Sequence, residues 1–348
     1  MTVHWAVAGC STIADTRVAP AIRRCSQAEL VGFASHDAAR AREFAARHGA
    51  PRSYASFEDL LADDSIDVVY IGGLNPVHAP QTIRAAKAGR HVLCEKPMAT
   101  TLEDARAMIE VCADSGRVLG INHHLRGAAP HARMRELIAD GAIGTPVFVR
   151  ISFPVLLPEQ ARTWRLDPDA EGGVLFDIGT HCADLVRWLL GAEIESVSCF
   201  AAEQTFRRGA EDAAVASLIF DSGCLGVLYM AYNAANGVMG VDVQGTRGSL
   251  RATGTLEQVP QGQAYLLDES GDHELETTPV DLYERHIVAL CEAVVTGCKP
   301  LATAQDGYRS LEAALAMRRA AATGSVVTLN GLESEQNRGR RVLKAHDD

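Results

Sequence analysis

The fold of this chain is decided by residues 3–14, which read VHWAVAGCSTIA. The first six residues form a compact apolar run, typical of a buried strand, and that run ends at Gly9. A helical stretch then extends to about Arg24. Strand, glycine turn and helix in this order form the first unit of a dinucleotide-binding fold. The sequence therefore predicts a parallel sheet with a nucleotide site at the end of its first strand.

The turn after this strand has the features that a pyrophosphate needs. Gly9 permits a tight turn, and the helix that follows begins with Ser11, Thr12 and Ile13. Free backbone N–H groups and the helix dipole can hold an anion at such a helix start. Ser11 stands where the GxGxxG fingerprint has its middle glycine, so the motif is degenerate. An ordinary strand–helix turn is the alternative interpretation.

The end of the second expected strand, Leu30–Ala34, bears on the choice of cofactor. A fold that prefers NAD has an acidic residue near this point, which binds the ribose 2′-hydroxyl. Here Ser35 is neutral and Arg40 follows five residues later. A hydroxyl and a guanidinium suit a 2′-phosphate, which favours NADP(H). Asp37 could instead serve NAD(H), and Arg40 could be only a solvated helix charge.

The loop after the apolar strand Val68–Ile71 lies at the same edge of the predicted sheet. It contains Asn75 and His78, two polar side chains that could contact the nicotinamide ribose. Asn75 precedes a proline, so turn chemistry alone could explain it. His78 could equally be a residue of the first helical turn.

Residues 91–97, HVLCEKP, place a cation where another buried strand ends. Pro97 has no N–H, so strand pairing stops there and Lys96 is biased towards an extended backbone. Ligands of open α/β sheets bind just beyond the carboxyl ends of the strands. The strand Val118–Ile121 delivers Asn122 to the same edge. Lys96 can therefore point into a substrate cleft, although a surface lysine is the simpler alternative.

A second constellation lies in residues 172–184, GGVLFDIGTHCAD. Asp177 and His181 are four residues apart, so they share one face of the predicted helix. A carboxylate and an imidazole one turn apart can bind the same substrate. Upstream, Trp164 and Arg165 offer a stacking surface and a cation, which suit a sugar ring. A capping aspartate, a buried histidine and a surface ion pair are the structural alternatives.

The chain divides into two predicted domains and a tail. Residues 1–122 form the dinucleotide-binding domain, and residues 123–329 form a substrate domain with a large, mainly antiparallel sheet. The helix Gly179–Leu190 is expected to cover one face of this sheet and to leave the other open. An open face commonly pairs with another subunit, so we expect a homodimer or homotetramer through it. Residues 330–348 are polar, and this composition predicts a mobile tail.

The composition excludes several classes of function. The net charge of −11 argues against general affinity for nucleic acid or anionic membranes. The nine cysteines lack any CxxC pair or metal-ligand spacing, which indicates reduced thiols in a cytoplasmic protein with no metal. We find no signal peptide, and no apolar run approaches the ~20 residues of a membrane span.

Together these motifs resemble the glucose–fructose oxidoreductase, inositol dehydrogenase and rhizopine-catabolism (Gfo/Idh/MocA) family. The resemblance runs from Val3 to about Val326, and its most specific parts are Glu95-Lys96-Pro97 and residues 172–181. It implies an N-terminal Rossmann domain and a C-terminal α+β domain with a large open sheet. It also implies a catalytic Lys96, a cofactor contact at Glu95, and substrate or proton-transfer roles for Asp177 and His181.

The expected function is therefore hydride transfer between the nicotinamide of NADP(H) and a carbonyl or hydroxyl carbon of a sugar or polyol. In this interpretation Lys96 binds the substrate oxygen and His181 transfers the proton. Asp177 anchors a neighbouring hydroxyl and orients His181. Two alternatives remain open, an NAD-linked polyol or aldose dehydrogenase and a non-catalytic nucleotide sensor on the same fold.

Overall fold

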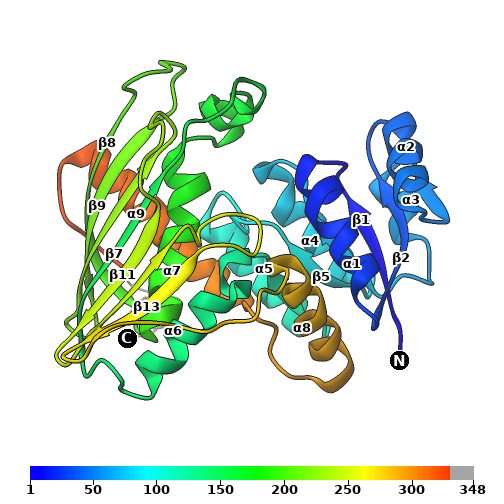
Figure 1. Ribbon diagram of the computed structural model, residues 1–348. Helices are drawn as coiled ribbons and strands as arrows, with labels where there is room; N and C mark the ends of the chain where they lie inside the picture. Colours follow the sequence, from blue (N-terminus) through cyan, green and yellow to red (C-terminus); the bar gives the residue numbers. More distant parts are fainter. Residues whose placement is uncertain (330–348) are drawn as a thin grey trace, which may run out of the picture.

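The computed structural model describes residues 1–329 as two sheets with helices between and around them, as Figure 1 shows. The predicted tail, 330–348, lies outside the described residues. The first sheet has the strand order β3-β2-β1-β4-β5-β6, and every neighbouring pair is parallel. The predicted α/β class, with a Rossmann sheet followed by a larger and mainly antiparallel one, is confirmed.

The first sheet is built from short strands that are mostly buried, apart from the third along the chain. They are β1 (Val3–Ala8), β2 (Ala28–Ala34), β3 (Arg52–Tyr54), β4 (Val68–Ile71), β5 (His91–Cys94) and β6 (Leu119–Ile121). The helices between them are α1 (Ala19–Arg24), α2 (Ala38–His48), α3 (Phe57–Leu61), α4 (His78–Lys87) and α5 (Leu102–Asp114). Strands buried on both faces read as continuous apolar runs, which is why the sequence reveals most of them.

Two local features of this domain differ from the sequence prediction. The expected single helix up to Arg24 begins with a π-helical turn, Ala14–Val18, before α1. The strand β3 was not expected, because its three residues are mostly exposed and carry no apolar pattern. Ser56 caps the start of α3, since its side chain accepts a hydrogen bond from the Asp59 amide.

The second sheet is larger than predicted, with nine strands within residues 1–329 in the order β14-β13-β12-β11-β7-β10-β9-β8-β15. The sequence pattern indicates strands at 147–153, 197–201, 214–220, 224–232 and 238–244. The structure has at these places β7 (Pro146–Pro154), β8 (Ile194–Ala202), β9 (Ala213–Phe220), β10 (Leu225–Ala231) and β11 (Gly240–Gly245). Unexpected ones were β12 (Ser249–Thr253), β13 (Gln263–Asp268), β14 (Gly271–Glu274) and β15 (Val327–Thr328). The pairing is antiparallel except between β7 and β10, which run parallel.

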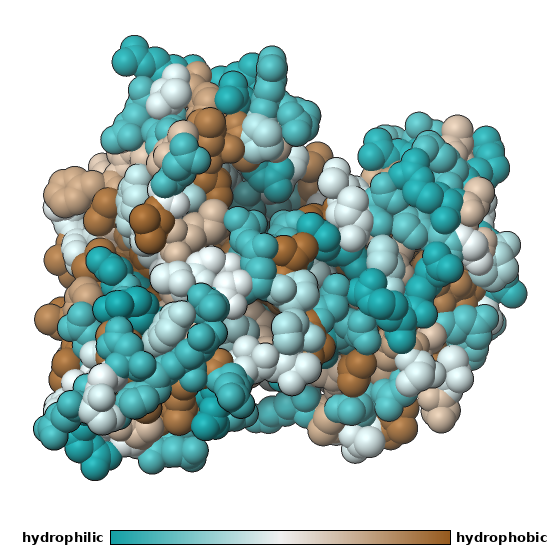
Figure 2. Space-filling view, viewed as in Figure 1, coloured by the Kyte–Doolittle hydropathy of each residue, from teal (hydrophilic) through white to brown (hydrophobic). Residues whose placement is uncertain are grey.

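In the described part of the chain, residues 1–329, helices cover one face of this sheet and leave the other without a helix. α6 (Ala129–Ala139) and α7 (Thr180–Leu190) lie between it and the first domain, and α9 (Ala304–Thr323) packs along β8 (Figure 1). On the other face Phe200, Ile219 and Leu225 are exposed, and the last two are direct neighbours across the strands β9 and β10. Figure 2 shows hydrophobic side chains gathering at the left, over the large sheet.

Two C-terminal helices return to the first domain. The helix α8 (Leu282–Thr296) buries Leu282, Ile287 and Leu290 in the same core as Val3 and Trp5 of β1. Tyr308 and Leu311 of α9 enter the core on the other side of the parallel sheet. The last part of the described chain therefore completes the hydrophobic core around the first sheet. Within residues 1–329, every helix is too short or too polar to cross a membrane.

Candidate active site

The carboxyl edge of the parallel sheet brings two glycine turns into contact. Gly9 follows β1 with a φ of +102°, and a Cβ there would lie 2.9 Å from the backbone of Gly72 and Gly73. These turns flank the point where the strand order reverses, between β1 and β4, which is where such sheets bind ligands. Thr12 and Ile13 follow at the helix start, where backbone N–H groups lack intrahelical acceptors. Ser11 Oγ accepts a hydrogen bond from the Ala14 amide. The residues present therefore fit a dinucleotide.

A cavity of about 440 Å³ continues from this turn towards the end of β2. Thr12, Asp37, Arg40 and Arg47 are among its lining residues. Asp37 Oδ1 accepts two amide hydrogen bonds as the cap of α2. Arg47 is paired with Asp15, whereas Arg40 has no carboxylate partner within residues 1–329. Ser35 lies at the end of β2, where its Oγ accepts from the Asp37 amide. An unpaired guanidinium thus lines a cavity beside the predicted ribose site.

Glu95 and Asn122 are joined at the ends of β5 and β6. Asn122 Nδ2 donates to Glu95 Oε1 at 2.6 Å, and the Tyr70 hydroxyl donates to the same oxygen at 2.7 Å. Burial raises the pKa of Glu95, and these two hydrogen bonds offset part of the rise. Asn122 Oδ1 is buried and has no partner among residues 1–329. Glu95 therefore holds Asn122 in place and leaves its acceptor atom unpaired.

Lys96 and Asp177 meet across the two domains. The Lys96 ammonium is hydrogen-bonded to Asp177 Oδ1 and lies 3.0 Å from the Asp177 carbonyl oxygen. Asp177 Oδ2 accepts from Arg165 Nε at 2.8 Å and from the Tyr232 hydroxyl at 2.7 Å. Burial favours the neutral acid, but Lys96 and Arg165 more than offset this and hold the pKa of Asp177 well below its ordinary value. Asp177 is therefore an anion between two cations.

His181 follows one turn later, where the π-helical turn Leu175–Gly179 leads into α7. Burial, followed by the positive charge of Lys96, lowers the pKa of His181 well below its ordinary value. The His124 ring lies 4.7 Å from it, centroid to centroid. No hydrogen bond joins Asp177 to His181 in the part of the chain that the structure describes. The expected orienting contact is therefore replaced by contacts of Asp177 with Lys96, Arg165 and Tyr232.

Three further predicted residues have structural contacts. Asn75 is buried and donates to the Glu171 carbonyl at 3.1 Å, across the two domains. Both ring nitrogens of His78 lie within hydrogen-bond distance of backbone carbonyls, those of Pro97 and Gly73, at 2.8 and 3.1 Å. These contacts leave His78 no nitrogen for a cofactor. Trp164 is half-buried, and the Arg165 guanidinium lies 4.5 Å from its ring centroid.

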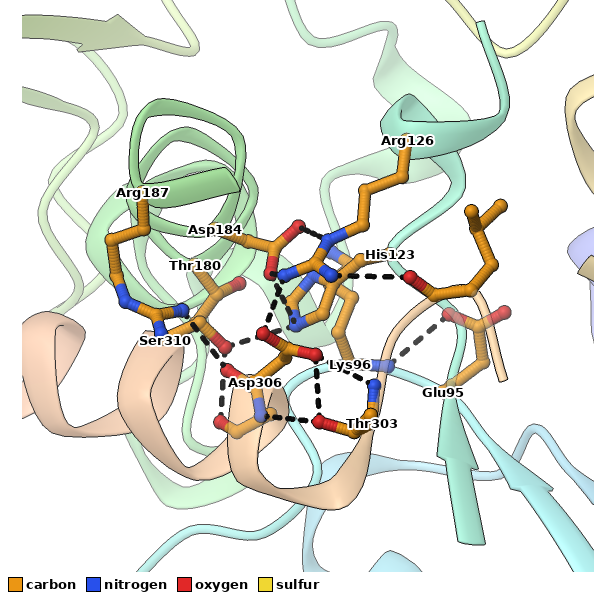
Figure 3. Close-up of polar contacts among 12 residues, drawn as sticks. Glu95, Lys96, His123, Arg126, Thr180, Asp184, Arg187, Thr303, Asp306 and Ser310 are labelled. Carbon is orange, nitrogen blue, oxygen red and sulfur yellow. Dashed lines mark hydrogen bonds and ion pairs between the residues drawn. The ribbon is translucent and has the colours of Figure 1, made fainter. Parts of the chain in front are cut away.

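Behind Lys96 lies a buried ionic network, drawn in Figure 3. Arg126 binds Asp184 through two hydrogen bonds, at 2.8 and 2.6 Å, and Asp306 at 2.9 Å. His123 Nε2 lies 2.9 Å from Ser310 Oγ on α9. Asp184, which shares the helix of His181, is thus engaged away from Asp177. The network fixes α7 and α9 beside the loop that carries His123.

Sequence reasoning missed Tyr232 and Tyr70, the two hydroxyls that hold the site carboxylates. Tyr232 lies just past the end of β10 and Tyr70 lies within β4, where a tyrosine reads as an ordinary strand residue. The period-2 alternation gives the buried side of each strand but does not identify the partner of a buried hydroxyl.

This fold and site define a dinucleotide-dependent oxidoreductase. The nucleotide edge lies against a Lys–Asp pair and a neutral imidazole, a set that can bind an oxygen and transfer a proton. Comparisons with known proteins agree. Residues 3–123 match the family described as "Oxidoreductase family, NAD-binding Rossmann fold", and residues 131–251 match the "GFO/IDH/MocA C-terminal domain".

Two curated relatives match almost end to end. The 1,5-anhydro-D-fructose reductase of Ensifer adhaerens is 39% identical over 94% of this chain and 98% of its own length. A D-xylose 1-dehydrogenase (NADP(+)) of Haloferax volcanii is 31% identical over 93% of this chain and 99% of its own length. Among solved structures, the aldose-aldose oxidoreductase of Caulobacter crescentus has a TM-score of 0.88 at 27% identity and covers 94% of this chain and 100% of its own.

The chain belongs to the Gfo/Idh/MocA family, as its motifs indicate. It is an NAD(P)-dependent oxidoreductase that acts on CH–OH groups.

Proposed function

We propose that this enzyme reduces a sugar carbonyl with NADPH, with 1,5-anhydro-D-fructose as the first candidate substrate. The observation that carries the proposal is the contact of Lys96 with Asp177 across the two domains, next to His181. The 39% identity to the Ensifer adhaerens reductase supports this substrate over others. The bound cofactor supplies the hydride at nicotinamide C4. Asn122, with its unpaired Oδ1, contacts cofactor or substrate beside Glu95.

The side chains of the site have separate roles in the proposed reaction. Lys96 donates a hydrogen bond to the substrate oxygen and stabilises the negative charge that develops there. Asp177 keeps the ammonium in position and accepts from a neighbouring hydroxyl of the sugar. His181 delivers the proton, and Trp164 and Arg165 contact the sugar ring. General acid–base help of this kind is typically worth roughly 100- to 10,000-fold in rate.

The direct test follows NADPH absorbance with purified enzyme and a panel of sugars and polyols that includes 1,5-anhydro-D-fructose, D-xylose and myo-inositol. We expect oxidation of NADPH with 1,5-anhydro-D-fructose and the highest kcat/KM for this compound. Reduction of NADP⁺ by D-xylose alone would replace the proposal with the aldose dehydrogenase alternative. Tight NADPH binding with no turnover across the panel would contradict the proposal.

The cofactor preference is proposed to rest on Arg40, because it lines the cavity at the end of β2 and has no carboxylate partner in the part of the chain that the structure describes. Arg40→Ala is expected to raise the Kd for NADPH by about 10- to 100-fold, since a hydrogen bond to a charged group is worth ~1.5–3 kcal/mol. The Kd for NADH should change little. Fluorescence titration of both cofactors measures this.

Arg42→Ala is the matched control, because Arg42 is exposed on the same helix and does not line the cavity. An equal loss of NADPH and NADH affinity in Arg40→Ala would instead assign NAD(H) to the site, with Asp37 as its ribose ligand.

We also propose that the open face of the large sheet joins subunits into a homodimer or homotetramer in the cytoplasm. Ile219 and Leu225 are direct cross-strand neighbours there, and Phe200 is 82% exposed on the same sheet. Exposed apolar patches of this kind mark interfaces. Ile219→Glu combined with Leu225→Glu is expected to convert the oligomer to a 37.2 kDa monomer by light scattering.

Val295→Glu is the control for that change, because Val295 is a half-exposed apolar residue on α8, away from the sheet. A wild-type enzyme that is already monomeric, or a double variant that keeps its mass, would contradict the proposed interface.

A further inference from the structure

The helix α2 presents two arginines to the cavity at the end of β2. Arg40, Phe44 and Arg47 share one face of this helix, at spacings of four and three residues, and all three line the cavity. The Cζ atoms of Arg40 and Arg47 lie 5.5 and 5.2 Å from the centroid of the Phe44 ring. Phe44 is buried, so its ring anchors the part of the cavity wall that carries both cations.

The two arginines differ in their partners. Arg47 Nη1 donates to Asp15 Oδ2 and Arg47 Nη2 donates to Glu43 Oε1, each at 2.5 Å. Asp15 Oδ1 also lies 2.7 Å from His48 Nε2, whereas Arg40 has no carboxylate partner within residues 1–329. Among the described residues, the cavity thus has one guanidinium open to an anion and a second that carboxylates hold.

The charges that line this cavity oppose a phosphate as they stand. Three carboxylates face two guanidiniums, those of Asp15, Asp37 and Glu43 against those of Arg40 and Arg47. A phosphate monoester carries about −1.5 to −2 charges at neutral pH. An exposed ion pair contributes little to stability, and a doubly charged phosphate attracts a guanidinium more strongly than one carboxylate does. The exchange of a carboxylate for a phosphate at Arg47 is therefore favourable.

We propose that Arg47 is a second ligand of the cofactor 2′-phosphate, and that Asp15 and Glu43 limit the affinity for NADPH by competing for it. This inference rests on the proposed use of NADPH and adds a specificity-determining residue to the same cavity. The Glu43 side chain is 61% exposed and can turn into water, whereas Asp15 is also held by His48. Glu43 therefore leaves Arg47 when the phosphate binds, and Asp15 keeps Arg47 beside the cavity.

Glu43→Gln is expected to lower the Kd for NADPH about two- to fivefold, because it removes a competitor and exposed ion pairs have energies of this order. The Kd for NADH, which has no 2′-phosphate, should not change measurably. Fluorescence titration of both cofactors at low ionic strength measures this. The gain for NADPH should shrink at about 1 M salt, where surface charges are screened.

The combined variant Arg47→Ala and Glu43→Gln tests whether Arg47 binds the phosphate or only neutralises Glu43. It removes one positive and one negative charge, so the net charge of the cavity stays the same. The Kd for NADPH should rise about 3- to 10-fold above the wild type, less than for Arg40→Ala because Arg47 must first give up Glu43. The Kd for NADH should not change. Calorimetry with adenosine 2′,5′-bisphosphate and 5′-AMP should give the same contrast without the nicotinamide half.

The Arg84–Glu58 pair supplies the matched control. Its side chains are exposed to the same degree as those of the Arg47–Glu43 pair, at 45% and 62% against 46% and 61%, and neither lines the cavity. Arg84→Ala combined with Glu58→Gln should leave the affinity for both cofactors unchanged.

Two outcomes would overturn the inference. The first is a combined Arg47→Ala and Glu43→Gln variant that binds NADPH as the wild type does, because Arg47 would then be only an ion-pair partner. The second is an equal loss of NADPH and NADH affinity in that variant, because Arg47 would then contact a part of the cofactor that both share.

The Arg40→Ala titration separates this inference from the proposed function. If Arg40→Ala loses NADPH selectively and the combined variant does not, the proposed use of NADPH stands and the role of Arg47 fails. If Arg40→Ala loses both cofactors equally while the combined variant loses NADPH alone, the phosphate lies at Arg47 and the proposed role of Arg40 fails. None of these titrations uses a sugar, so an absence of sugar reduction would leave the inference intact.

Discussion

Lys96→Ala is expected to lower kcat at least about 1000-fold while NADPH still binds with nearly its wild-type affinity. Among residues 1–329 the ammonium is the cation nearest the Asp177 carboxylate, and it lies at the carboxyl end of β5, where we propose that the substrate oxygen binds. Its removal abolishes the donor that stabilises charge on that oxygen, a contribution of roughly 100- to 1000-fold for one donor. It also removes the cation that fixes Asp177.

Single-turnover kinetics and NADPH titration measure the two effects of Lys96→Ala separately. Lys87→Ala is the matched control, because Lys87 is an exposed lysine in the last turn of α4. If Lys96→Ala lost NADPH binding but kept its turnover per bound complex, Lys96 would be a cofactor ligand rather than a catalytic residue.

Asp177→Asn is expected to lower both activity and stability. The amide cannot balance Lys96 and Arg165, and breaking a buried ion pair from one side typically costs about 3–5 kcal/mol. With the Lys96 ammonium no longer held, kcat should fall at least about 100-fold. Urea unfolding and steady-state kinetics measure the two losses, and Asp169→Asn, in an exposed position of the preceding loop, is the control.

The difference in unfolding free energy between the wild type and Asp177→Asn should depend on pH in one direction. The pKa of Asp177 is depressed in the folded state, so its contribution is complete above the unfolded pKa of ~3.9. The difference between wild type and Asp177→Asn should therefore be constant near neutral pH and shrink as the pH falls below about 4. A difference that grew on acidification would mean that Asp177 is protonated in the folded enzyme.

The sequence offers local patterns for the candidate site residues but none for their partners. The strand ends at Lys96 and Asn122, and the spacing of Asp177 and His181, are local patterns that can be read directly. The contacts of Asp177 are not local, because Lys96 lies 81 residues away and Tyr232 lies 55 residues away. The helix-face argument placed Asp177 and His181 side by side, but the carboxylate is held by partners that no spacing rule identifies.

The fold shows the same division between local and long-range information. Apolar strands such as β1 and β4 were found because burial on both faces leaves a continuous pattern. The strands β13 and β14 were missed because their half-exposed residues lack that pattern. The return of α8 to the first domain was also missed, since an amphipathic helix does not reveal which core its apolar side enters.

That return of α8 limits how modular this enzyme is. Leu282, Ile287 and Leu290 come from the far end of the chain, yet they cover the sheet that carries the nucleotide turn. A fragment that ended near residue 122 would leave this apolar surface bare to water. Grafting the cofactor half onto another substrate half would thus require transplanting residues 282–296 as well, so such a recombination within the family needs three crossover points rather than one.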